Sequence, residues 1–300
     1  MIYDSVIIGG GPAGLSAALV LGRARRNVIL FDDNKPRNAV TQESHGYLTR
    51  DGITPTEFRQ ISHAEITNYP SVEIRPVRVS SVQKHSDLFE IVLEDSKSFQ
   101  ARSVILATGL KEKLPTVPHI HDFYGKSLFS CPYCDGWERQ DKPLILISES
   151  EHAFHMAKTV WNWSHDLTVC TNGHQPLTKD QLETLQQKGI QIISDRITNL
   201  VGKGGHLEKV IFETQGEKDF ETGFVTTQWF QASSFGSELG CEVNAQNLMV
   251  VDPLGRTTVP GVYAAGESLG FPSQLIIAAA EGSRAAAGVN MDLIEKEFAV

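Results

Sequence analysis

Two cysteines separated by two residues, and followed at once by an aspartate, are the feature of this sequence that most directly suggests chemistry. Cys131 and Cys134 stand in a segment that reads Cys-Pro-Tyr-Cys-Asp-Gly. Two thiols at this spacing can close a small, reversible disulfide, and the attacking species in thiol–disulfide exchange is a thiolate. Asp135 directly follows the pair and could carry a proton to or from a thiol. The segment therefore predicts redox chemistry at sulfur.

Two other interpretations of the cysteine pair stay open at this stage. A zinc site is one, but its remaining ligands would have to come from Cys170, Cys241 or scattered histidines, and none stands at zinc-finger spacing. A buried, inert pair is the other. Four cysteines in 300 residues do not form a disulfide framework. The cysteine usage therefore predicts a reducing compartment, the cytoplasm, and no metal site.

A glycine-rich turn near the start of the chain has the layout of a dinucleotide-binding site. An apolar run at 5–8 leads into Gly9, Gly11 and Gly14, spaced G-x-G-x-x-G, and an Ala- and Leu-rich helical segment follows at 15–25. The first glycine permits a tight turn, the second lets a pyrophosphate approach the backbone, and the third lets the helix pack closely on the strand. Free N–H groups at the start of the helix attract phosphate.

A second apolar run completes this unit, and a similar unit follows later in the chain. The run at 28–31 ends in Asp32, which is placed to accept hydrogen bonds from a ribose. An ordinary tight turn between strand and helix is the alternative interpretation. The later unit has predicted strands at 142–147 and 167–170 on either side of a predicted helix at 151–163.

The remaining segments predict further strands, a linker and a final helix. Residues 34–56 are polar and turn-rich, which predicts a loop with a short helix, and a charged and then Pro-spaced stretch at 111–118 predicts a linker. The other predicted strands lie at 72–75, 88–93, 103–106, 189–193, 209–213 and 257–267, and the predicted last helix lies at 274–287.

Composition and charge exclude several classes of protein. The 300 residues are 41% hydrophobic and 21% charged, which is typical of a folded globular chain of about two domains. The formal net charge of −9 repels phosphate backbones, so nucleic acid is not an expected partner. Glycines interrupt the weakly polar stretch at 6–22, charges interrupt the one at 275–289, and no basic segment precedes the first. Neither a membrane span nor a secretory signal is therefore predicted.

Three separated segments together resemble the flavoprotein disulfide reductases that have two dinucleotide-binding domains. They are the glycine turn at 9–14, Ile-Leu-Ala-Thr-Gly at 105–109, and Val-Tyr-Ala-Ala-Gly-Glu at 262–267, where the family usually ends in Gly-Asp. The resemblance implies FAD as cofactor and an α/β fold of two Rossmann-like domains, the second inserted into the first. It places a discontinuous FAD-binding domain at 1–113 and 244–300, and an inserted NAD(P)-binding-like domain, which carries the cysteine pair, at 114–243.

The cysteine segment, in sequence and position, is similar to that of the low-molecular-weight thioredoxin reductases, and the likeness runs along nearly the whole chain. It implies that Cys134 faces the flavin, that Cys131 exchanges with the substrate and that Asp135 is the acid or base. It also implies a homodimer, a rotation between domains, and a thioredoxin-like protein or a small dithiol or disulfide as partner. The residues expected to bind the flavin are Gly9, Gly11, Pro12, Ala13, Gly14, Asp32, Asp33, Arg37, Asn38, His45, Ala107, Thr108, Gly109, Gly266, Glu267 and Gln274. For His45 and Gln274, an ordinary loop residue and an ordinary helix-terminal residue are equally open.

The resemblance fails where a thioredoxin reductase binds NADPH. The segment at 148–153 reads Ser-Glu-Ser-Glu-His-Ala, without the glycines that let backbone approach a pyrophosphate, and Glu149 and Glu151 add like charge. The stretch at 170–174 lacks the basic cluster with which the family grips the 2′-phosphate. We therefore predict that ordinary use of NADPH is doubtful. A capping box formed by Ser148 and Glu151 is a simpler structural explanation of the first segment.

The electron partner of the flavin is not determined by these residues. In one direction, a substrate dithiol reduces the cysteine pair and oxygen reoxidises the flavin, as in the gliotoxin- and holomycin-forming dithiol oxidases, which resemble this arrangement. In the other direction, a ferredoxin-type protein supplies the electrons. An NADPH-dependent thioredoxin reductase with an unusual nucleotide site is a further alternative, and a flavin-binding redox sensor without turnover is an alternative of another class.

Overall fold

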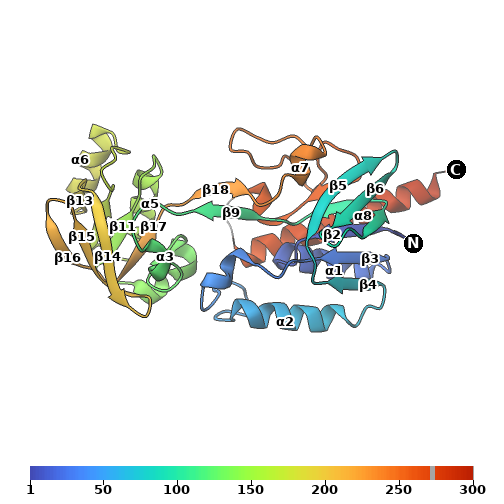
Figure 1. Ribbon diagram of the computed structural model, residues 1–300, viewed down its shortest axis with the longest axis horizontal. Coiled ribbons are helices and arrows are strands. Elements are labelled where there is room, and N and C mark those ends of the chain that lie inside the picture. The colour runs from blue at the N-terminus through green and yellow to red at the C-terminus, as the bar shows by residue number, and fades with distance from the viewer. Residues whose placement is uncertain (271–273, 300) are drawn as a thin grey trace. The chain divides into compact units, whose positions relative to one another are not determined.

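The computed structural model describes residues 1–270 and 274–299, and the chain divides into two compact units. Unit 1 contains residues 1–39, 46–111 and the segment from 230 onward, and unit 2 contains residues 40–45 and 112–229. Most of unit 2 is thus an insertion between two parts of unit 1. Each unit is built around a parallel sheet with helices (Figure 1), which confirms the predicted α/β class.

A five-stranded parallel sheet forms the centre of unit 1. Its strands, in spatial order, are β19 (Val262–Ala264), β8 (Val104–Leu106), β2 (Ser5–Ile8), β3 (Val28–Phe31) and β4 (Val72–Arg75). The strands predicted at 5–8, 28–31 and 72–75 are confirmed, whereas the strand predicted at 257–267 is limited to β19. The central strands are buried along their whole length, because this parallel sheet is covered on both faces.

The two faces of the sheet are covered by different layers. Ile7 and Leu30 point toward helices α1 (Pro12–Arg23) and α8 (Leu275–Phe298). Because successive side chains of a strand point to opposite faces, their neighbours Val6 and Phe31 point to the other face and pack against a four-stranded sheet. That sheet consists of β1 (Ile2–Tyr3), β7 (Ser98–Ala101), β6 (Leu88–Leu93) and β5 (Val79–His85).

Helices α1 and α8 lie side by side (Figure 1) and touch through their backbones. A Cβ atom on Gly282 would lie 1.9 Å from the carbonyl oxygen of Ala13, so only glycine fits at this crossing. The prediction that the last helix ends at residue 287 is wrong, because Val289 and Leu293 continue its buried face as far as Phe298.

Helix α2 (Pro55–Ile66) follows a predicted loop and was not itself predicted. Thr54 accepts a hydrogen bond from the N–H of Glu57, and Pro55 occupies the first helical position. Only Pro55 and Ile66 are fully buried, so the sequence carries too little hydrophobic periodicity to indicate this helix. The shorter helices of unit 1 are η1 (Arg37–Val40), α7 (Phe235–Glu238) and η3 (Gly266–Leu269).

Unit 2 repeats the arrangement of a parallel sheet with flanking helices. Its five strands, in spatial order, are β10 (Leu128–Phe129), β17 (Thr222–Val225), β11 (Leu144–Ile147), β12 (Leu167–Cys170) and β13 (Gln191–Ile193). An antiparallel sheet of β14 (Ile197–Lys203), β15 (His206–Phe212) and β16 (Gly216–Asp219) follows. The helices are α3 (Ile120–Phe123), α4 (Pro132–Asp135), η2 (Trp137–Arg139), α5 (Ala153–Val160) and α6 (Lys179–Gln187). The predicted strand at 167–170 is confirmed, and the predicted helix at 151–163 is shorter than expected.

The predicted linker at 111–118 begins as a strand rather than as irregular chain. Strand β9 (Leu110–Lys113) pairs with β18 (Gln228–Gln231) in a two-stranded sheet. The chain therefore leaves unit 1 and returns to it through two strands that are hydrogen-bonded to each other. No helix among the described residues has both the length and the apolarity needed to cross a bilayer.

Candidate active site

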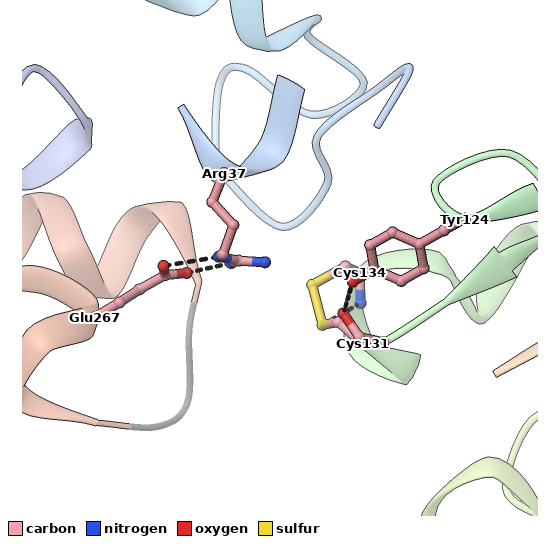
Figure 2. The surroundings of a disulfide bond; sticks show 6 residues. Arg37, Tyr124, Cys131, Cys134 and Glu267 are labelled. Carbon is pink, nitrogen blue, oxygen red and sulfur yellow. Dashed lines mark hydrogen bonds and ion pairs between the residues drawn. A yellow bond between two sulfur atoms is a disulfide. The ribbon is translucent and has the colours of Figure 1, made fainter. Parts of the chain in front are cut away.

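The predicted cysteine pair forms a disulfide in unit 2. Cys131 and Cys134 are bonded through sulfur, with their Cα atoms 5.3 Å apart (Figure 2). Cys131 precedes the single turn α4, and the N–H of Cys134 donates to Sγ of Cys131 at 3.1 Å. Because a thiolate is a better hydrogen-bond acceptor than a thiol, this N–H favours the thiolate of Cys131 once the disulfide opens. The alternative of a zinc site is not supported, since both sulfurs are engaged with each other.

Asp135 is held beside this pair in an environment that keeps its carboxyl protonated to unusually high pH. Burial is the main cause that raises the pKa of Asp135 to about 6; the charge of Arg139 opposes this shift, the charge of Glu138 adds to it, and His45 opposes it. The guanidinium of Arg139 donates to the backbone carbonyl oxygen of Asp135 at 2.7 Å and lies 3.6 Å from the centre of the Phe129 ring. The acid predicted from sequence thus has a pKa close to neutrality, which suits proton transfer.

Two residues around the pair show what the sequence could and could not reveal. His45 lies in unit 2 with Nε2 3.6 Å from Oε1 of Glu138. Arg139 was not predicted, because a lone arginine five residues after a cysteine forms no recognisable motif.

Two aromatic side chains next to the cysteine pair are exposed. Tyr133 is 69% exposed and Trp137 is 70% exposed, so the disulfide lies beside a large aromatic surface.

The predicted glycine turn forms an open cradle at the start of α1. A Cβ on Gly9 would lie 2.2 Å from the carbonyl oxygen of Ala107, and one on Gly14 would lie 1.8 Å from that of Gly9. A Cβ on Gly11 would meet no atom of the described residues within 4 Å, and among these residues α1 has no side-chain cap and no acid in its first turn. The free N–H groups of the helix start therefore face open space, which fits the diphosphate of a dinucleotide.

The other expected flavin residues of unit 1 converge on this cradle from distant parts of the sequence. Figure 2 shows the guanidinium of Arg37 against both carboxylate oxygens of Glu267, with Nε 2.9 Å from Oε2. Gly109 and Gly266 have φ values of +68° and +81°, and a Cβ on Gly109 would lie 3.8 Å from Oε2 of Glu267. A Cβ on Gly266 would lie 2.9 Å from that of Ala13. The three sequence segments of the resemblance thus meet in space.

The remaining expected residues, apart from His45, also lie in unit 1. The hydroxyl of Thr108 accepts a hydrogen bond from Ser233 at 3.1 Å, and Oδ1 of Asp33 accepts one from the N–H of Lys35 at 3.2 Å. Gln274 occupies the N-cap position of α8. Its side chain forms no capping hydrogen bond with the described residues of the helix. The rest of the set comprises Pro12 at the first position of α1, Asn38 in η1, and Asp32 at the end of β3.

At the corresponding position of unit 2, acidic and amide side chains occupy the ends of the strands. Oε1 of Glu149 accepts a hydrogen bond from Nδ2 of Asn172 at 2.6 Å, and Oδ1 of Asn172 accepts one from the N–H of Ile197 at 2.8 Å. A carboxylate is therefore fixed between the carboxyl ends of β11 and β12. In a Rossmann-like unit this is the side on which a nucleotide binds.

The expectation of a capping box in this segment is wrong. Helix α5 begins at Ala153 after His152, and it has no side-chain cap. The hydroxyl of Ser148 is buried and accepts a hydrogen bond from Thr226 at 2.8 Å. Residues 150–152 therefore form a turn before the helix starts, so Ser148 is too early in the chain to cap it.

Comparisons with known proteins define the class. A family model described as pyridine nucleotide-disulphide oxidoreductase matches residues 3–282. Thioredoxin reductase sirT of Leptosphaeria maculans is 30% identical over 316 residues, which cover 99% of this chain and 96% of the relative. A putative thioredoxin reductase TrxB from Bacillus anthracis has 47% identity, a TM-score of 0.95 and coverage of 99% of this chain and 100% of that chain. HlmI has 33% identity, a TM-score of 0.95 and coverage of 99% and 94%.

These similarities confirm two Rossmann-like domains and a redox disulfide, the hallmarks of a flavoprotein disulfide oxidoreductase. The chain belongs to the pyridine nucleotide-disulphide oxidoreductase family and, within it, to the thioredoxin reductase-like enzymes, whose cofactor is FAD.

The electrostatics of Asp135 give a prediction that can be tested without a substrate. We expect the ¹³C resonance of its carboxyl, assigned by Asp135→Asn, to titrate with a midpoint of about 6. In Arg139→Gln the midpoint should rise, because the positive charge that favours the carboxylate is removed, whereas Arg139→Lys should stay close to the wild type. An ordinary aspartate midpoint in the wild-type protein would contradict the burial argument.

Proposed function

We propose that this enzyme transfers electron pairs between a substrate thiol or disulfide and FAD through Cys131 and Cys134, without ordinary use of NADPH. The observation that carries the proposal is the Cys131–Cys134 disulfide beside a buried acid whose pKa is raised to about 6. A purely structural disulfide needs no such acid. We further assign FAD to the domain formed by 1–113 and 244–300, and the redox pair to the inserted domain at 114–243.

The residues divide the exchange step between them. In the direction of disulfide reduction, the Cys131 thiolate attacks one sulfur of the substrate, a mixed disulfide forms, and the first substrate sulfur leaves as a thiolate. Protonated Asp135 gives that thiolate its proton. Cys134 then attacks Sγ of Cys131, so the second substrate thiolate leaves and the Cys131–Cys134 disulfide forms again. The opposite direction uses the same steps in reverse order.

The cofactor residues of the proposal are those of the cradle around α1. FAD, when bound, accepts or supplies the electron pair of the cysteines at its isoalloxazine ring. The diphosphate would lie against the N–H groups that follow Gly11, where no side chain intervenes. Gly9 and Gly14 shape the turn, and Arg37 orients Glu267. His45 and Gln274 are assigned to the surroundings of the flavin by resemblance alone.

Replacing either cysteine tests the proposal directly. Cys131→Ser and Cys134→Ser should each abolish turnover, by more than about 1,000-fold, because neither variant can close the disulfide. The matched control is Cys241→Ser, which makes the same change at a buried thiol of unit 1 and should keep turnover and the yellow colour of bound FAD. Turnover that survives in either active-site variant would refute the assigned chemistry.

The second nucleotide-binding position argues against NADPH. Glu149 is fixed at the strand ends by Asn172, where the nucleotide phosphates of a related reductase would lie. A like-charge pair at about 4 Å costs about 4 kcal/mol at an effective dielectric of about 20. Micromolar binding is worth only about 8 kcal/mol, so one such contact removes about half of it. The runner-up is an NADPH-dependent thioredoxin-disulfide reductase with an unusual nucleotide site.

Anaerobic reduction of the bound flavin separates these functions. We expect micromolar NADPH and NADH not to bleach the flavin, whereas a small dithiol, reduced thioredoxin or a reduced ferredoxin does. Glu149→Gln removes the charge and keeps an oxygen for Asn172, so it should strengthen any residual NADPH binding, by up to about 1,000-fold if the full cost of the like-charge contact is recovered. Rapid bleaching of the wild-type flavin at micromolar NADPH would establish the runner-up instead.

The same measurement decides the direction of electron flow and the partner. Bleaching by a dithiol followed by reoxidation in air supports a dithiol oxidase, and bleaching by ferredoxin supports a protein-linked reductase. A redox sensor would show bleaching without steady-state turnover.

We place the enzyme in the cytoplasm, because Cys170 and Cys241 are both free thiols.

We also propose that the enzyme is a homodimer that uses an exposed face of α8. Met291, Ile294 and Phe298 are 51%, 38% and 82% exposed and recur at helical spacing on one side of this helix. Met291→Lys should shift the sedimentation coefficient from dimer to monomer, while the control Lys296→Met should not. A wild-type monomer at micromolar concentration would contradict the proposal.

A further inference from the structure

Arg59, on the unpredicted helix α2, joins two parts of the cradle that lie far apart in sequence. Its Nη1 donates to the carbonyl oxygen of Gly10 at 3.0 Å. Its Nη2 donates to Oδ2 of Asp32 and, at 2.9 Å, to Oδ1 of Asn34. The side chains of Arg59 and Asp32 are only 12% and 11% exposed, so this ion pair is largely shielded from water. One guanidinium therefore ties the glycine turn to the end of β3.

The ion pair with Arg59 occupies one carboxylate oxygen of Asp32 and leaves the other oxygen able to accept a hydrogen bond from a ligand. Oδ2 is engaged by Arg59, while Oδ1 forms no hydrogen bond with any residue in the described parts of the chain. Asp32 and Arg59 also border a cavity of about 460 Å³, whose wall continues over the apolar side chains of Val72 and Ile74. A ligand in this cavity would lie beside Asp32, whose Oδ2 is held by Arg59, and against an apolar surface.

Gly10 makes the arrangement sterically specific. A Cβ at this position would lie 2.6 Å from Cγ of Asp32, so a side chain there would displace the carboxylate. Arg59 and Gly10 thus restrict Asp32 from two sides, by a charged hydrogen bond and by close contact. A freely rotating aspartate would lose side-chain entropy on binding a hydroxyl, and a pre-oriented one avoids most of that cost.

We infer that Arg59 is a positioning residue for the adenosine half of FAD: it orients Asp32 so that Oδ1 accepts a hydrogen bond from the ribose. The inference rests on the cradle proposed above but not on the chemistry of the cysteines. Arg59 acts through Asp32, so it affects the nucleotide end of the cofactor and leaves the flavin end unchanged. A general structural role, in which Arg59 only attaches α2 to the sheet, would weaken both ends alike.

Binding of the two halves of the cofactor to the apoprotein distinguishes these roles. The affinities of FAD, ADP and FMN are measured by titration calorimetry, with displacement of FAD where a half-ligand binds weakly. In Arg59→Gln we expect FAD and ADP to bind at least tenfold more weakly, which is about 1.4 kcal/mol. FMN should change less than twofold. Equal weakening of all three ligands, or unchanged affinity for FAD and ADP, would overturn the inference.

Three further variants make the test specific. Arg59→Lys keeps the charge but cannot reach both Gly10 and Asp32 with a planar fork, so it should restore only part of the affinity for ADP. Asp32→Asn combined with Arg59→Gln should be no worse than Asp32→Asn alone, because Arg59 acts through Asp32. The control Arg102→Gln, which removes an arginine ion-paired with Asp4 and Glu297, should leave all three affinities unchanged.

If Arg59→Gln unfolds the apoprotein, Arg59→Lys still decides the question: weaker binding of FAD and ADP with unchanged FMN binding supports the inference, and unchanged or equally weakened binding of all three ligands overturns it. The outcome is also independent of the proposed reaction. Loss of ADP affinity in a variant that still exchanges thiols would support this inference whatever the fate of the NADPH proposal. Unchanged ADP affinity would reject it even if the cysteine variants behave as expected.

Discussion

The close approach of one main-chain segment to another around α1 is the constraint on which unit 1 depends. Gly14 lies against the carbonyl of Gly9, Gly9 lies against that of Ala107, and Gly282 lies against that of Ala13. The last two contacts join α1 or the turn before it to a segment from another part of the chain. A methyl group at any of these positions would separate segments that must meet to bind one dinucleotide, because packed interiors have no free volume to absorb it.

The two units share an arrangement of parallel strands and helices, but they differ in the charge at the position where such an arrangement binds a nucleotide. At the start of α1, Gly11 has no described atom close to it and the first turn of the helix contains no acidic residue, so the N–H groups remain available to an anion. At the corresponding strand ends of unit 2, Glu149 is fixed by Asn172, which is itself held by a backbone N–H. One unit therefore presents a phosphate-binding surface, while the other presents a carboxylate.

Buried carboxylates in this chain behave differently according to what their arginine neighbours contact. Arg59 and Arg37 bond directly to the carboxylates of Asp32 and Glu267, which satisfies those charges. Arg139 instead donates to the backbone carbonyl of Asp135, and among the described residues no side chain bonds directly to the carboxyl group of Asp135. Burial then dominates and raises the pKa of Asp135 to about 6, which adapts an ordinary residue type to proton transfer near neutral pH.

The sequence by itself determined the local elements whose signals are contained within a few residues. The G-x-G-x-x-G turn, the apolar strands at 5–8 and 28–31, and the spacing of Cys131 and Cys134 all act over short range, so they could be predicted. Only the tertiary structure decided the partners of the charged groups. Arg59 reaches Asp32 from a helix with little hydrophobic periodicity, and Glu149 bonds Asn172. These contacts join residues that are distant in sequence, and a charged side chain carries no local signal of the group it will meet once the chain has packed.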